Sequence, residues 1–146
     1  MHRQNMLQVI SSIKINAAPS HVMGLYLDYL HWNKLFGLTV RSTRFISGED
    51  GVIILAIDHK HEGPVINTLT VVSEDEVKLE EFKRKYNATI LNFFQPYERG
   101  TLYSVVAGIK LKGIYKMTAP FIRNVIKRRI SKFILQPVKK YAEMVF

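Results

Sequence analysis

Apolar residues recur at steps of three and four along the last segment of the chain, from residue 119 to residue 146. The stripe consists of Ile122, Ile126, Ile130, Phe133, Ile134, Val138 and Tyr141. This spacing predicts one α-helix with an apolar face. At a rise of about 1.5 Å per residue, some 27 residues would span roughly 40 Å, so the helix needs a broad apolar surface to lie on. Pro137 has no amide hydrogen, and it is expected to kink or restart the helix near residues 133–135.

Seven earlier segments alternate between apolar and polar residues with a period of two, which is typical of β-strands. The predicted strands span residues 6–15, 39–47, 52–61, 65–73, 77–83, 86–95 and 101–111. All links but the first are short, which favours an antiparallel meander over parallel crossover units.

The longer first link predicts two short helices, over residues 19–30 and 31–36. Pro19 suits the first position of a helix, and Gly37 is a suitable stop for the second. Trp32 and Phe36 are expected to be buried where these helices meet the sheet. A chain of 146 residues predicts a single domain over residues 1–146. The predicted fold class is therefore α+β, with a curved seven-stranded antiparallel sheet wrapped around the long C-terminal helix.

Composition excludes several kinds of chemistry. Apolar residues make up 47% of the chain and charged residues 23%, which are ordinary values for a globular protein. The chain has no cysteine, so disulfides, thiolate catalysis and cysteine-ligated zinc are excluded. The N-terminal residues do not form a signal peptide, and no apolar run is long enough to cross a bilayer. We therefore expect a cytoplasmic protein.

The net charge of +9 is concentrated in the last third of the chain. No acidic residue occurs between Glu98 and Glu143, an interval that holds eleven lysines and arginines: Arg99, Lys110, Lys112, Lys116, Arg123, Lys127, Arg128, Arg129, Lys132, Lys139 and Lys140. This asymmetry predicts an anionic partner, such as a membrane surface, a nucleic acid, an acidic ligand or an acidic protein. The alternative is a solvated helix face that keeps the protein soluble.

Several short motifs follow one another along the whole chain at characteristic spacing. They are IKINAAPSHV at residues 13–22, Leu27-Asp28 followed by Trp32 and Phe36, Gly100-Thr101, and the closing helix at residues 118–143. This succession resembles the START-like superfamily, also called polyketide cyclase/dehydrase or SRPBCC, whose fold is the helix-grip. The chain departs from many members at His21, where an acidic residue is common, and at Met23, where tryptophan is common. The departures leave the fold expectation unchanged but assign no subfamily.

The resemblance implies a cavity between sheet and helix that binds a hydrophobic or amphipathic small molecule, such as a lipid, an isoprenoid or a polyketide-like compound. The expected contacts on the helix are Ile122, Ile126, Arg129, Ile130 and Phe133, and those on the last two strands are Asn92, Phe94, Tyr103 and Val105. Arg129 lies near the edge of the apolar stripe, where it either pairs with an anionic group of the ligand or extends along its methylenes to solvent.

Two alternative functions use the same residues differently. A cyclase or dehydratase would need an acid or base, for which Tyr103, His59, Asp58 and Arg129 are the candidates. A basic module for membrane surfaces or RNA would leave the cavity incidental. His59 and His61 could share one strand face, but beside Gly63-Pro64 a solvated strand end is the preferred interpretation, and no metal or cofactor is expected. No Gly-x-Ser-x-Gly or phosphate-binding glycine loop is present.

Overall fold

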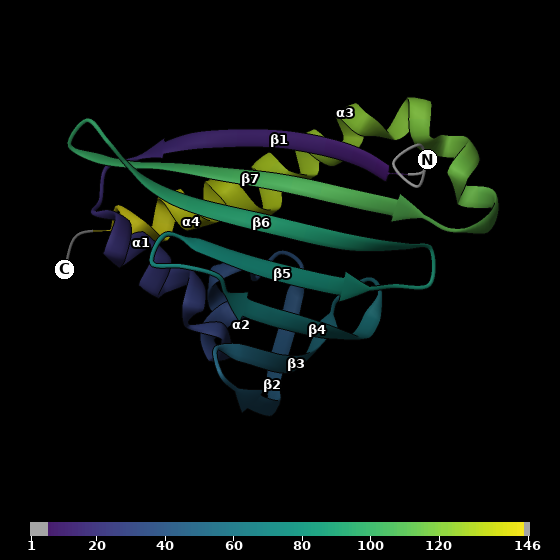
Figure 1. Cartoon of the computed structure of the whole chain (residues 1–146), viewed down its shortest axis with the longest axis horizontal. Coiled ribbons are helices and arrows are strands. Elements are labelled where there is room, and N and C mark those ends of the chain that lie inside the picture. Colours follow the sequence, from purple (N-terminus) through teal and green to yellow (C-terminus); the bar gives the residue numbers. More distant parts are fainter. Residues whose placement is uncertain (1–5, 145–146) are drawn as a thin grey trace.

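The computed structural model describes residues 6–144 of the chain (Figure 1). Seven strands and a series of helical segments follow one another in the predicted order. The strands are β1 (Met6–Ile15), β2 (Val40–Glu49), β3 (Val52–His59), β4 (Gly63–Val71), β5 (Glu76–Phe82), β6 (Tyr86–Tyr97) and β7 (Gly100–Leu111). The helical segments are α1 (Pro19–Leu27), η2 (Tyr29–His31), α2 (Trp32–Leu35), η3 (Gly113–Thr118), α3 (Ala119–Ile130), η4 (Ser131–Leu135) and α4 (Gln136–Ala142).

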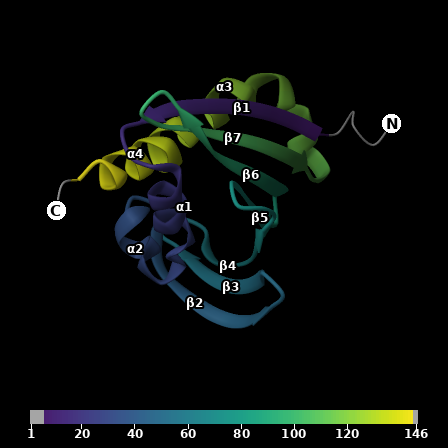
Figure 2. The same cartoon turned by 60° about the vertical axis from the view of Figure 1, so that its left-hand side comes forward.

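The strands form one antiparallel sheet in the order β1-β7-β6-β5-β4-β3-β2. Consecutive strands from β2 to β7 are neighbours because each link between them is a short turn, and β1 closes the order by pairing with β7. The sheet curls around the C-terminal helix, which lies on its concave side (Figure 2). The expected helix-grip architecture is confirmed.

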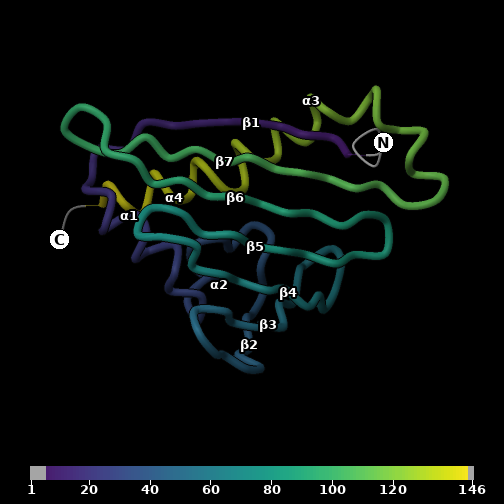
Figure 3. Tube along the Cα trace, viewed as in Figure 1, coloured from purple at the N-terminus to yellow at the C-terminus, as the bar shows by residue number. Residues whose placement is uncertain are grey.

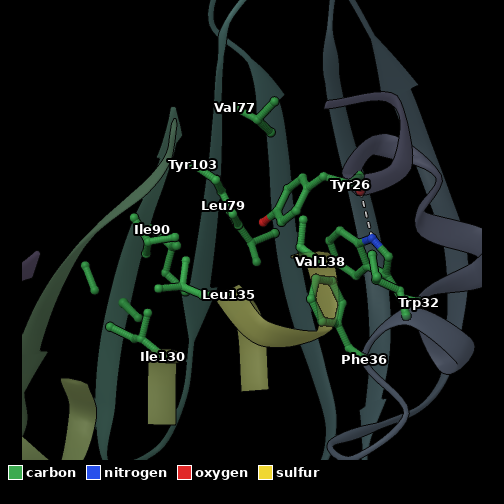
Figure 4. Close-up of a cluster of buried hydrophobic side chains, with 14 of the residues drawn as sticks. Tyr26, Trp32, Phe36, Val77, Leu79, Ile90, Tyr103, Ile130, Leu135 and Val138 are labelled. Carbon is green, nitrogen blue, oxygen red and sulfur yellow. Dashed lines mark hydrogen bonds between the residues drawn. The ribbon is translucent and has the colours of Figure 1, made fainter. Parts of the chain in front are cut away.

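The inner face of the sheet and the two short helices share one hydrophobic core. Trp32 and Phe36 are buried, as predicted, and Trp32 Nε1 donates a 2.8 Å hydrogen bond to the carbonyl of Tyr26 (Figure 4). Tyr26 also lies against Phe36 and Phe94, with ring centroids 6.1 and 5.8 Å apart. These aromatic contacts anchor the pair of short helices to the sheet.

The C-terminal helix contains a π-helical turn, η4, directly before Pro137. The interruption lies where the missing amide hydrogen of Pro137 predicts it, and its form changes which residues are buried. Ile130 is buried, and the next fully buried residue is Leu135, five positions further on. Phe133 and Ile134, which the regular spacing assigned to the buried stripe, are only half-buried. None of the helices within residues 6–144 is long and apolar enough to cross a membrane.

Element boundaries differ from the sequence-based ones by a few residues in several places, and two of these differences overturn an expectation. Strand β3 ends at His59, and His61 is exposed in the turn that Gly63 completes with a φ of 74°. His59 and His61 therefore do not share a strand face. The final helix ends at Ala142, so the expectation that it continues to the C-terminus is wrong for 143 and 144, while 145–146 lie outside the described residues.

Candidate functional site

A cavity of about 340 Å³ lies between the concave face of the sheet and the C-terminal helix. The space exists because two inward positions on adjacent strands carry alanine: Ala88 on β6 and Ala107 on β7. Each is paired across the ladder with an isoleucine, Ala88 with Ile109 and Ile90 with Ala107. The alternation of small and large side chains leaves room under α3 that the helix does not fill.

Most of the cavity wall is apolar. Its sheet side consists of Val40, Ile57, Leu79, Ala88, Ile90, Ala107, Ile109 and Leu111, and its helix side of Ile122, Val125, Ile126, Ile130, Phe133 and Ile134. Tyr26, Trp32 and Phe36 form the wall at one end, where α1 and α2 cover the sheet (Figure 4). Such a wall favours an apolar ligand.

Polar residues gather in one part of the wall, which we call the polar corner: His59, Asn67, Glu81 and Lys83. Glu81 is directly opposite Asn67 in the ladder between β4 and β5, and its Oε2 lies 3.7 Å from His59 Nε2. The same oxygen lies 3.5 Å from Lys83 Nζ. Lys83 also contacts Glu62 Oε2 at 2.8 Å and donates a 3.1 Å hydrogen bond to the Tyr86 hydroxyl.

Burial and neighbouring groups together determine the charges of the polar corner. Burial lowers the pKa of His59, and the nearby Lys83 charge also opposes protonation, so the lowering persists despite the attraction of Glu81. The imidazole is therefore neutral at pH 7. Burial alone would lower the pKa of Lys83 too, but Glu81, Tyr86 and the hydrogen bond to Glu62 outweigh it and raise that pKa, which keeps the ammonium charged.

Two buried polar atoms in this corner have no hydrogen-bond partner among the described residues: His59 Nε2 and Asn67 Oδ1. Buried polar atoms are nearly always paired, because an unpaired one loses its hydration without compensation. Both atoms belong to residues that line the cavity. The corner can therefore accept and orient a hydrogen-bonding group that enters the cavity.

The cavity opens between α3 and the turn that follows β3. Its exposed lining residues are His61, Glu62, Val125 and Arg129. Glu62 has a lowered pKa, because its hydrogen bond and ion pair with Lys83 outweigh the opposing effect of burial. Within residues 6–144, no cluster of three or more His, Asp or Glu side chains is arranged to hold a metal ion.

The helix residues expected to contact a ligand all line this cavity: Ile122, Ile126, Arg129, Ile130 and Phe133. Arg129 is exposed at the mouth, where its guanidinium carbon lies 5.7 Å from the centroid of the Phe133 ring. Its charge is the smallest of the contributions that lower the pKa of Glu62.

The four strand residues expected to contact a ligand lie elsewhere: Asn92, Phe94, Tyr103 and Val105 are buried beyond the end wall and do not line the cavity. The Tyr103 hydroxyl donates a 2.5 Å hydrogen bond to Asn92 Oδ1, and Asn92 Nδ2 donates one of 3.1 Å to the Tyr26 hydroxyl. Burial raises the pKa of both tyrosines, which keeps them neutral. This network supports Tyr26, which does line the cavity.

Sequence reasoning did not assign Asn67, Glu81 or Lys83 to the site, although one signal was available. Val77, Leu79 and Glu81 occupy alternate positions of β5, so they point to the same face of the sheet. A carboxylate at the third inward position of a buried strand is unusual, because desolvation of an unpaired charge is costly. That exception to the pattern marks the polar corner.

No protein-family model matches the sequence, and no curated protein matches it. Solved structures share its fold at low sequence identity. The di-domain ARO/CYC StfQ from the steffimycin biosynthetic pathway superposes with a TM-score of 0.80 at 12% identity, covering 97% of this chain and 52% of StfQ. The chain therefore spans about half the length of that protein.

Two further similar structures match over nearly their whole length. The Zhui aromatase/cyclase from Streptomyces sp. R1128 has a TM-score of 0.77 at 9% identity, with 94% of each chain covered. A START superfamily protein from Mycobacterium smegmatis has a TM-score of 0.78 at 9% identity, covering 93% of this chain and 97% of that one. The chain thus has the helix-grip fold of START-like proteins, as its sequence motifs indicated.

Proposed function

We propose that this protein binds an amphipathic small molecule in the cavity between the sheet and the C-terminal helix. The observation that carries the proposal is a pair of buried atoms, His59 Nε2 and Asn67 Oδ1, that have no partner within residues 6–144 and lie at one side of an otherwise apolar cavity. An apolar body would lie against Leu79, Ile109 and Ile126. One polar group would reach the corner and pair with those atoms.

The size of the cavity limits the ligand class. At about 340 Å³ it is at the lower end of the usual range for small-molecule pockets, about 300–1,000 Å³. A compact ring system or one short chain fits this space, whereas a two-chain lipid does not. Among the ligands considered from the sequence, the volume favours a polyketide-like or short isoprenoid compound.

The similar structures support this class without naming a member. Two are described as aromatase/cyclases and one as a START superfamily protein. At identities of 9–12% their ligands and reactions do not transfer residue by residue to this chain. We therefore expect the polar corner of this chain to determine which ligand it binds.

A matched pair of fluorescent probes, 2-naphthol and 2-methylnaphthalene, tests the proposal. The two differ mainly in a hydroxyl against a methyl group, so a site with unpaired polar atoms should prefer naphthol by about tenfold. Asn67→Leu, which leaves His59 Nε2 in place, should reduce the preference while 2-methylnaphthalene still binds. Equal binding of both probes to the parent protein would contradict a polar recognition site. If neither probe binds, the cavity is not a binding site. Native mass spectrometry of freshly purified protein would identify a ligand that co-purifies.

An enzyme that transfers protons is the second candidate, because the polar corner contains titratable groups with perturbed pKa values. A neutral His59 can take a proton from a carbon next to a carbonyl. The electron pair of the broken C–H bond then moves onto the carbonyl oxygen as an enolate, and the Lys83 ammonium stabilises this charge. Return of the proton from His59 restores the ketone. Cyclase and dehydratase reactions both begin with such a step.

Deuterium exchange at the α-carbon of 2-tetralone, followed by NMR in heavy water, measures this step without knowledge of the natural substrate. Exchange at least about tenfold faster than in buffer, and lost in His59→Gln, would support catalysis. Exchange at the buffer rate alongside tight naphthol binding would support a carrier. Location in the cytoplasm stays a prediction.

A further inference from the structure

One end of the molecule exposes three large apolar side chains in a row. Ile114 and Met117 on η3 and Phe121 on α3 have exposed fractions of 76%, 78% and 79%. Spacings of three and then four residues across a 3₁₀ turn and an α-helix place them on one side of the segment. We call these residues the exposed stripe. The segment η3, which directly follows β7, lies beyond the end of that strand (Figure 1).

Basic side chains lie near the exposed stripe in two parts of the chain. Lys116 and Arg128 are exposed on the same helical segment, and Arg128, seven residues after Phe121, lies on the same side of α3. The β5–β6 turn, whose Arg84 and Lys85 are exposed, lies against this segment (Figure 3). The contact consists of a 3.0 Å hydrogen bond from the Lys112 amide to the Lys85 carbonyl, and Lys85 Nζ lies 5.5 Å from the Tyr115 ring centroid.

We propose that this end of the protein docks on an anionic lipid bilayer. Apolar side chains exposed to this extent on a monomer mark an interaction surface. The basic residues supply the attraction to negatively charged headgroups, and the stripe supplies apolar area that inserts among the acyl chains. The two contributions reinforce each other because they project from the same segment.

The charges argue against the two other occupants of such a surface. A second copy of the chain would bring the same lysines and arginines face to face, which is repulsive. Single-stranded nucleic acid binds through stacking on several aromatic rings, whereas the stripe contains one, Phe121. Insertion into a bilayer is favourable for isoleucine and methionine side chains as well as for phenylalanine.

The position of the stripe also places the bilayer beside the cavity. Ile122 and Ile126 of α3 line the cavity, and Val125 lies at its mouth with 40% of its surface exposed. Docking would therefore bring the mouth near the apolar part of the membrane, from which a ligand could enter. The docking itself goes beyond the proposed ligand binding and does not depend on it.

Co-sedimentation with vesicles tests the proposal. Vesicles of phosphatidylcholine alone are compared with vesicles that also contain phosphatidylserine, in a ratio of about 7 to 3. We expect binding to the anionic vesicles that weakens as salt rises. Replacing Met117 and Phe121 together by serine should lower the partition coefficient by about tenfold or more, because two exposed apolar anchors are lost. The charge reversals Lys116→Glu and Arg128→Glu should lower it independently.

A matched control uses two apolar residues that are exposed elsewhere. Ile66 on β4 and Val72 are each 49% exposed, and their joint replacement by serine should leave vesicle binding unchanged. The proposal is overturned if the Met117/Phe121 variant binds as well as the parent, or if neutral vesicles bind equally. It is also overturned if the parent dimerises through the stripe in sedimentation velocity, or if a single-stranded oligonucleotide binds more tightly than anionic vesicles at the same salt.

Discussion

His59 Nε2 and Glu81 Oε2 lie 3.7 Å apart although their strands, β3 and β5, are not neighbours. The curvature of the sheet brings the two side chains together over β4. The separation is too long for a hydrogen bond, and Lys83 approaches the same carboxylate oxygen to 3.5 Å. The negative charge of Glu81 is therefore balanced by the Lys83 ammonium, and the His59 imidazole remains neutral.

The neutral state of His59 predicts how stability depends on pH. The folded protein holds the pKa of His59 below the unfolded value of 6.5, so the unfolded chain binds the proton more readily. The corresponding stability is fully present above pH 6.5 and is lost as the pH falls through the lowered folded value. In urea unfolding between pH 7.5 and about 5, we expect the free energy of unfolding of the parent to fall more steeply than that of His59→Gln.

Exposed His21 on α1 provides the control for this measurement. His21→Gln should retain the slope of the parent, because its side chain lies in solvent in both states. If the free energy of unfolding falls equally with pH in the parent and both variants, the acid sensitivity arises from carboxylates. The conclusion that folding lowers the pKa of His59 would then be wrong.

The Gly-Thr pair at the start of β7 predicts a second effect. A Cβ at Gly100 would lie 2.2 Å from the carbonyl oxygen of Ile15, while Thr101 Oγ1 donates a 2.7 Å hydrogen bond to the Ala17 carbonyl. Gly100→Ala must displace the backbone of β1 and should destabilise by about 1–3 kcal/mol. Gly24→Ala on α1 has open space and should stabilise by about 0.5–1 kcal/mol. A denaturant midpoint of Gly100→Ala no lower than that of the parent would contradict the close approach at Gly100.

The π-helical turn predicts an unequal pair of core substitutions. Leu135 is 1% exposed, and Leu135→Ala should lower the free energy of unfolding by about 2–5 kcal/mol. Ile134 is half-buried beside an existing cavity, so Ile134→Ala should cost less, about 1–2 kcal/mol. In a regular α-helix Ile134 would lie one turn after Ile130 on the buried face. Ile134→Ala would then cost more than Leu135→Ala. The ranking of the two variants in chemical unfolding thus tests the register of the helix.

Most of the fold could be predicted because strand alternation and helix periodicity are local. Residues such as Val9 and Ile15 on β1 are buried as the period of two requires, and Pro19 and Ala119 begin helices as expected. The shift from Ile134 to Leu135 could not be predicted in the same way. Pro137 indicates that the regular α-helical hydrogen bonding is interrupted in this part of the helix. That the interruption takes the form of a wider π-helical turn depends on packing against the sheet.

The candidate site divides in a similar way. The five helix residues line the cavity, because one face of the helix has to meet it. Tyr103 and Val105 also point inward, but they lie outside the cavity on β7, which α1 contacts. Alternation tells which face a residue is on, whereas the position of a neighbouring helix along the strand depends on the whole fold.

This difference along β7 gives the last prediction. Ala107 lines the cavity, and Val105, two residues earlier on the same face, is 0% exposed in the filled core. A phenylalanine ring at Ala107 can enter existing space, so Ala107→Phe should change the free energy of unfolding by less than about 1 kcal/mol. Val105→Phe has no space and should lose about 1–3 kcal/mol through overpacking.

The two variants should also differ in probe binding, but here Ala107→Phe is the variant that loses function. Ala107→Phe occupies the cavity and should abolish binding of 2-naphthol while the protein remains folded. Val105→Phe, measured below its unfolding transition, should retain binding because the cavity itself is untouched. Thermal unfolding and probe fluorescence on the same samples measure both effects. Loss of stability and retention of probe binding in Ala107→Phe would mean that the space between sheet and helix is filled in solution, and that the ligand binds elsewhere.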